Sequence, residues 1–254
     1  MLKVAVLVTA ALAVASADPA PRVEITGAHA FGEAELRSAA FGSDEPAVFD
    51  GSGAIIENAV DQAELRLTDY YYDRGYPNAR VGPPVVTPFH VAVPVDEGDR
   101  YTIGSVAFTG TLVGDPAAHL VRMQTRAGMV FDRDAIVGDN DALVARYQDL
   151  GYAWAHVVPL TKIDFEHHTI ALAFEIAPGR TYYVDHIAIT NTTKIPDATL
   201  LDAAKPMRGH ELYSASALAE YKRTLLALGA PAVAITTEPG TTPDTVVVKV
   251  EVGN

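Results

Sequence analysis

The chain has 254 residues, of which 49% are apolar and 20% are charged, the balance of an ordinary globular protein. Its formal net charge is −13, which weighs against nucleic acid or an anionic lipid surface as a partner, because both attract basic patches. The chain holds no cysteine, so disulfides and cysteine-based metal or redox chemistry are excluded.

The N-terminus has the three parts of a secretory signal peptide. Lys3 supplies a positive charge, residues 4–14 form a run of small, mostly apolar residues, and Ala15-Ser16-Ala17 is an A-x-A-like cleavage site. The apolar run is too short to span a bilayer as a helix. We therefore expect residues 1–17 to direct export and to be removed.

Three short strand patterns recur along the remaining chain, each an alternation of apolar and polar residues closed by a turn residue. They occupy residues 23–27, 106–110 and 187–191, and end in Gly27, Gly110 and Asn191. Alternating β-branched residues followed by Gly or Asn predict a strand that ends in a tight turn. The recurrence indicates an internal repeat.

An aromatic residue followed by a helix-capping residue recurs at intervals of 82 residues. The three pairs are Phe49-Asp50, Phe131-Asp132 and Tyr213-Ser214. Asp and Ser accept hydrogen bonds from the free N–H groups of a first helical turn, so each pair predicts the start of a long helix. Gly138-Asp139-Asn140 interrupts the apolar pattern of the second long helix. A shorter helix is expected before each pair, at residues 33–39, 117–123 and 198–204.

Each long helix is followed by a glycine and then by two strands. Gly75, Gly151 and Gly229 lie where a helix end favours a left-handed residue. The second strands are expected at residues 79–86, 153–158 and 232–237, and the third strands at residues 90–95, 169–176 and 246–252. The sequence thus predicts an α+β protein of three tandem β-α-α-β-β modules, each a three-stranded mixed sheet with two helices on one face. The modules are expected at residues 22–99, 100–180 and 181–254.

This ordered set of motifs resembles the POTRA domain. The motifs that carry the resemblance are Phe131-Asp132, Gly75-Tyr76, Gly151-Tyr152 and Glu97-Gly98 followed by Tyr101-Thr102-Ile103. The third copy departs from the pattern, with Gly229-Ala230 in place of Gly-Tyr. The resemblance covers the mature chain and implies an Omp85-type assembly factor or translocase at the periplasmic face of the outer membrane. It implies unfolded outer-membrane proteins or other assembly-complex subunits as partners, and a link to the outer membrane through a C-terminal barrel if the chain is a fragment.

The sequence predicts no catalytic residue, no cofactor and no metal site. It contains no G-x-G-x-x-G, Walker A or H-E-x-x-H motif. Residues 164–168 form the densest cluster of metal-capable side chains, but their register places them between the second and third strands of the middle module. We interpret them as a solvated turn, with adventitious metal binding as the alternative. Gly51-Ser52-Gly53 lacks the spacing of a nucleophile elbow and is interpreted as a flexible start of a helix.

Two aromatic features have competing interpretations. The run Tyr70-Tyr71-Tyr72 ends the first long helix and is expected mainly to pack on the sheet, with a binding stripe as the alternative. Trp154 is the single tryptophan. We interpret it as a core residue, and an exposed recognition residue is the alternative.

The functional hypothesis that the resemblance implies concerns strand edges. An edge strand presents unpaired N–H and C=O groups on which an extended client adds another strand. The second strand of the middle module is the preferred site, because Pro83-Pro84 and Pro231 limit pairing in the other two. Its candidate binding residues are Ala153, Trp154, Ala155, His156, Val157 and Val158. We expect Ala155→Pro to remove an edge donor and weaken client binding. The alternatives are a free-standing adaptor that docks by surface charge, and a metal-dependent periplasmic enzyme that uses residues 164–168.

Overall fold

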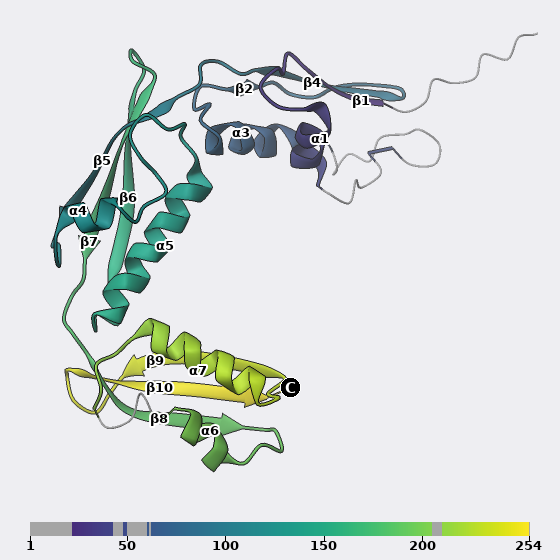
Figure 1. The fold of residues 1–254 in the computed structure, drawn as a ribbon. Helices are drawn as coiled ribbons and strands as arrows, with labels where there is room; N and C mark the ends of the chain where they lie inside the picture. Colours follow the sequence, from purple (N-terminus) through teal and green to yellow (C-terminus); the bar gives the residue numbers. More distant parts are fainter. Residues whose placement is uncertain (1–21, 43–47, 50–59, 61, 205–209, 254) are drawn as a thin grey trace, which may run out of the picture. The chain divides into compact units, whose positions relative to one another are not determined.

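The computed structural model describes residues 22–42, 48–49, 60, 62–204 and 210–253 (Figure 1). The described residues form two compact units, one of those up to residue 72 together with 78–98, and the other of those in 73–77 and 99–253. The first unit holds one mixed sheet and the second holds two. The predicted signal peptide and the Gly51-Ser52-Gly53 motif lie outside the described residues.

The sheet of the first unit is built around β4 (His90–Asp96). β1 (Arg22–Thr26) pairs with β4 in parallel, while β2 (Arg80–Val81) and β3 (Val85–Thr87) pair with it antiparallel. Helices α1 (Glu33–Phe41) and α3 (Ala63–Asp73) lie on one side of this sheet (Figure 1). The alternation along β4 buries Val91, Val93 and Val95. The residues between these valines are only partly buried, so one face of the strand packs on the core.

The middle module repeats this arrangement. β7 (Thr169–Ala177) is central, β5 (Thr102–Gly110) pairs with it in parallel, and β6 (His156–Asp164) pairs with it antiparallel. Helices α4 (Pro116–Leu120) and α5 (Arg133–Asp149) lie beside this sheet (Figure 1). The buried residues of β7 are Ile170, Leu172, Phe174 and Ile176.

The third module has the same order again. β10 (Thr245–Gly253) lies between β8 (Tyr183–Asn191), which is parallel to it, and β9 (Ala232–Pro239), which is antiparallel. Helices α6 (Asp197–Ala203) and α7 (Ala215–Ala227) complete the module (Figure 1). Buried valines at alternate positions of β10 face the apolar side of α7. The predicted fold class, three β-α-α-β-β modules with mixed sheets, is confirmed.

Helix ends follow the predicted chemistry. The side chain of Asp132 accepts a hydrogen bond from the Ala135 N–H (3.0 Å), and that of Ser214 accepts one from the Ala217 N–H (3.2 Å). The glycines that close the long helices have positive φ angles, +92° at Gly75, +93° at Gly151 and +94° at Gly229. Glycine adopts this conformation without a steric penalty.

Each long helix has a buried tyrosine, in the last turn of α3 and of α5 and in the middle of α7. These residues are Tyr71, Tyr147 and Tyr221, and each hydroxyl has a hydrogen-bond partner inside its own module: the Glu97 carboxylate, the Val113 N–H and the Leu200 carbonyl, respectively. Burial with a satisfied hydroxyl favours tyrosine here over an apolar ring. For Tyr71 this bears out the prediction that the tyrosine run packs mainly on the sheet.

The second long helix is more regular than its sequence pattern. α5 runs unbroken through Gly138-Asp139-Asn140. The Asp139 carboxylate is buried because it accepts hydrogen bonds from the Gln124 and Thr125 N–H groups (2.7 and 2.8 Å). The apparent interruption is therefore a polar contact that the helix makes with the preceding turn.

Within the described residues, none of the helices combines the length and the apolar character needed to cross a bilayer.

Candidate functional site

The second strand of each module forms an edge of its sheet. β6 is paired with β7 over all nine of its residues, and β9 is paired with β10 over all eight of its own. Among the described residues, no other strand is paired with the outer side of β6 or β9. Both strands therefore present main-chain N–H and C=O groups to the surroundings.

The proline of β6 indicates which residues of this strand direct their main-chain N–H and C=O groups away from β7. Pro159 lies opposite Phe174 of β7. A proline is tolerated in an edge strand where its missing N–H faces away from the neighbouring strand. Main-chain groups alternate in direction along an antiparallel strand, so those of Val157, Thr161 and Ile163 face outward with Pro159.

Exposed apolar side chains accompany this edge. Leu160 of β6 is 47% exposed, and Trp154, just before the strand, is 44% exposed. The Trp154 ring contacts the Tyr182 ring edge-on, with centroids 4.4 Å apart. The exposed residues of β9 instead include no large apolar side chain; they are Ala232, Ala234, Thr236, Glu238 and Pro239. β6 thus offers apolar contacts beside its main chain, and β9 offers few.

Trp154 is not the core residue that we expected. The core positions in this segment are Ala153, Ala155 and Val157, all of them buried. Alternation defines two faces but does not say which one packs on the helices, and the smaller side chains occupy the inner face. The alternative interpretation of Trp154, an exposed residue, describes its position.

The candidate binding residues 153–158 fall on two different structures. His156, Val157 and Val158 begin β6, whereas Ala153, Trp154 and Ala155 form the turn before it. The Ala155 N–H donates to the Tyr152 carbonyl at 2.9 Å, so it is not an edge donor. The strand that the sequence predicted to end at Val158 continues to Asp164. The Ala155→Pro substitution would therefore test the turn and leave the edge unexamined.

Of the two proline sites that we expected to limit pairing in the other modules, one interrupts its strand and the other does not. In the first module the predicted second strand is divided into β2 and β3, with Gly82-Pro83-Pro84 between them. In the third module Pro231 precedes β9 and does not shorten its pairing with β10. Pro231 therefore does not limit this edge as we predicted.

Residues 164–168 form the turn of the β6–β7 hairpin, as their register predicted. The Asp164 carboxylate accepts hydrogen bonds from the Glu166 and His167 N–H groups and lies 3.0 Å from the His167 Nδ1. The N–H bonds and the His167 ring hold the pKa of Asp164 below its usual value. Among the described residues, no group of three or more His, Asp or Glu side chains is placed to hold a metal ion.

The comparison with protein families agrees with this architecture. The family model for POTRA, described as a surface antigen variable number repeat, matches residues 21–100 and 101–179. The chain belongs to the POTRA family.

Two curated relatives place these POTRA modules among known proteins. The outer membrane protein assembly factor BamA of Nitratidesulfovibrio vulgaris is 26% identical over 162 residues, which are 60% of this chain and 20% of that protein. A putative outer membrane protein assembly factor of Treponema pallidum is 24% identical over 190 residues, 71% of this chain and 22% of that protein. The chain therefore spans about a fifth of the length of the relatives it matches.

One solved structure matches most of this chain. The crystal structure of Haemophilus influenzae BamA POTRA3-5 has a TM-score of 0.66 and 20% sequence identity, and the match covers 91% of this chain and 94% of that one. At this identity the match shows the fold. It extends that fold beyond the residues matched by the family model.

Proposed function

We propose that this chain is a periplasmic scaffold for outer-membrane protein assembly or translocation, and that it binds extended client or partner segments along the outer edge of β6. The proposal rests on one observation. β6 is a nine-residue edge strand whose main-chain groups on one side are unpaired within the described residues. An extended segment that pairs there would continue the sheet β5-β7-β6 by a fourth strand.

The chemistry of the edge suits a receptor for many clients. Main-chain hydrogen bonds are independent of side-chain identity, so they give affinity with little sequence selectivity. The strands of outer-membrane barrels alternate apolar and polar residues over about ten positions, a length close to that of β6. Leu160 and Trp154 would contact the apolar residues of such a segment.

The relatives support the biological setting. The two curated proteins are named as outer membrane protein assembly factors, one of them a putative one. We therefore assign the chain to the periplasmic face of the outer membrane, where such clients pass.

The decisive experiment removes one outward donor from β6 and keeps the strand. Thr161 is exposed on β6, and Thr161→Pro deletes its N–H at a position equivalent to that of Pro159. Thr161→Val is the matched control, because it keeps the N–H and the β-branched shape. The probe is a ten-residue peptide of alternating apolar and polar residues, and its dissociation constant is measured by fluorescence anisotropy.

We expect Thr161→Pro to weaken binding about fivefold, the worth of one hydrogen bond of about 1 kcal/mol, and Thr161→Val to leave it within a factor of two. Equal affinity of the wild type and Thr161→Pro, with circular dichroism showing both to be folded, would overturn the proposal. Binding that falls steeply with salt but ignores Thr161→Pro would instead favour the charge-docked adaptor.

A further inference from the structure

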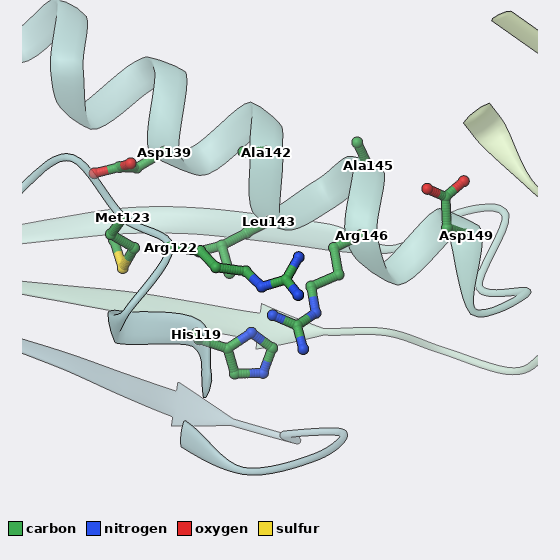
Figure 2. A pocket seen from close by; sticks show the side chains of 9 residues that line it. All are labelled: His119, Arg122, Met123, Asp139, Ala142, Leu143, Ala145, Arg146 and Asp149. Atoms are coloured by element: carbon green, nitrogen blue, oxygen red, sulfur yellow. The ribbon is translucent and has the colours of Figure 1, made fainter. Parts of the chain in front are cut away.

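The helical side of the middle module carries a pocket of about 550 Å³ that is separate from the β6 edge (Figure 2). Its walls come from the end of α4, the turn that follows and one side of α5. Met123 and Leu143 form an apolar surface inside it, and Arg122, Arg146 and His119 are its basic and imidazole groups. The pocket therefore combines a small apolar surface with concentrated positive charge.

The two guanidinium groups point toward the same end of the pocket, above the His119 ring (Figure 2). Arg146 donates one hydrogen bond to the Ala118 carbonyl (3.2 Å). In the described part of the chain, neither arginine forms an ion pair with a carboxylate. Two like charges that converge without a counter-charge repel each other, and an anion between them would remove this repulsion.

The carboxylates that border the pocket are engaged elsewhere. Asp139 accepts the Gln124 and Thr125 N–H groups, as described above. At the other end, Asp149 Oδ1 accepts hydrogen bonds from the Ser214 hydroxyl (2.9 Å) and the Ser216 N–H (2.7 Å). These contacts hold both acidic groups at the margins of the pocket, so the guanidinium groups stay available to a ligand.

His119 supplies a second, independent indication of a ligand. Its side chain is 1% exposed and stacks on the Tyr147 ring, with centroids 5.7 Å apart. The Nε2 atom lies 3.3 Å from the Val113 carbonyl, whereas Nδ1 is buried without a hydrogen-bond partner. A buried polar atom of this kind calls for a partner, and a bound anion would provide one to the protonated ring.

We propose that this pocket binds the carboxylate of an acidic side chain on a partner polypeptide, with Arg122 and Arg146 as the primary donors and His119 as the third. A guanidinium group matches a planar carboxylate through two parallel hydrogen bonds. Met123 and Leu143 would pack against the methylene groups of a Glu or Asp side chain. A monoanion suits the site better than a phosphate dianion, since Asp139 and Asp149 border it and the chain carries a net charge of −13.

Binding at this site is expected to take up a proton. Burial, followed by the positive charge of Arg146, holds the pKa of His119 below its usual value, while the Val113 carbonyl and Asp115 act in the opposite direction. The charged and titratable groups around the ring are Arg146 and Tyr147 on α5, Arg122 in the turn and Asp115 before α4. An anion between the arginines would raise the pKa of His119, so affinity should increase as the pH falls from 7.5 to 5.5.

The test uses the full chain and the capped tripeptide acetyl-Ala-Glu-Ala-amide, followed by NMR chemical-shift titration. The same peptide with Gln in place of Glu is the ligand control. Arg122→Gln removes one donor from an exposed residue, so folding is not at risk. Arg126→Gln is the matched protein control, because Arg126 lies in the same turn, is also exposed and donates to the Val121 carbonyl (3.2 Å) away from the pocket.

We expect the Glu peptide to bind at least about tenfold more tightly than the Gln peptide, Arg122→Gln to weaken the Glu peptide about tenfold, and Arg126→Gln to change it less than twofold. Titration at pH 5.5 should show tighter binding than at pH 7.5.

Equal binding of the two peptides, or equal effects of the two arginine substitutions, would overturn the proposal. Tighter binding of inorganic phosphate than of the Glu peptide would overturn it as well, in favour of a phosphate-bearing ligand. Because Thr161 lies on the β6 edge, outside the pocket, failure of this test would leave the test of the β6 edge unaffected.

Discussion

The first and middle modules share one topology but differ in the edge that follows the helix-closing glycine. In the middle module the edge is β6, which is paired with β7 from His156 to Asp164. In the first module it is broken into β2, of two residues, and β3, of three. Val81 lies opposite Val95 and Val85 opposite Ala92, so the outer chain holds one residue more than the central strand between these two pairs.

This difference has a local cause. Pro83 and Pro84 lack N–H groups, and Gly82 uses its own N–H for the Pro94 carbonyl of β4 (2.8 Å). The extra residue acts as a bulge, which bends an edge and interrupts its row of donors. The same fold can therefore carry a continuous edge strand in one module and an interrupted edge strand in another.

The largest effect is expected from a cavity in the core of the middle module, made on β7, the strand that pairs with β6. Phe174→Ala in β7 removes a ring that is fully buried and should cost about 3–5 kcal/mol, which is a large part of the stability of one module. Amides of β6 should lose hydrogen-exchange protection, whereas those of β4, in the other compact unit, should keep theirs.

Val93→Ala in β4 is the reciprocal change, with an expected cost of about 0.5–3 kcal/mol and loss of protection confined to the first module. Equal loss of protection in both modules after either substitution would show that the two units unfold together. In that case their edges could not be treated as separate.

A smaller effect is expected at the glycine that leads into β6. Gly151 has φ +93°, and a Cβ there would lie 2.5 Å from Leu212 Cδ1. Gly229 has φ +94° with nothing within 4 Å, which makes it the matched control. Both Gly→Ala substitutions should cost about 1–2 kcal/mol for the left-handed backbone, and Gly151→Ala about 1 kcal/mol more, because Leu212 must move. Urea unfolding measures the two values; equal values would mean that Leu212 adjusts freely.

Local chemistry predicted most of the fold. The helix caps at Asp132 and Ser214, the positive φ angles of Gly75 and Gly151, and the break at Pro83-Pro84 all depend on residues close together in the chain. Such features are set by backbone geometry and by nearby side chains, so one sequence is enough to find them.

The errors concern contacts between distant segments. The alternation of Ala153, Trp154 and Ala155 fits a strand, but a turn hydrogen bond and the Tyr182 ring decide the structure there. Arg122 and Arg146 lie 24 positions apart and meet because α4 and its following turn lie against α5. Only the length of β6 could have been predicted better from the sequence. Residues 169–176 were predicted as the strand that pairs with residues 153–158, and a partner of this length indicates that the second strand extends beyond Val158.

Repairing the first edge should have a modest effect. The double substitution Pro83→Val and Pro84→Thr restores two N–H donors between β2 and β3. The extra residue remains, so we expect a bulged edge with stability changed by less than about 1 kcal/mol. Hydrogen exchange at Gly82, which has the only amide N–H of residues 82–84 in the wild type, should slow, and the ten-residue peptide should gain a second, weaker site. No gain in peptide binding would show that the bulge alone closes this edge.

The smallest expected effect is a difference between the two modules in how their stability depends on pH. Burial tends to raise the pKa of Glu97, but hydrogen bonds from the Ala30 and His29 N–H groups and from the Tyr71 hydroxyl outweigh it and hold the pKa below 4.5. A carboxylate with a lowered pKa in the folded state stabilises the fold above the unfolded value, and this contribution is lost as the pH falls below about 4.5. The middle module has Pro178 at the corresponding position and so lacks this buried-helix carboxylate contact. Between pH 6 and pH 3.5 the unfolding midpoint of the first module should fall slightly more than that of the middle module, and Glu97→Gln should remove the difference. A difference that persists in Glu97→Gln would assign the acid sensitivity to other carboxylates of the first module.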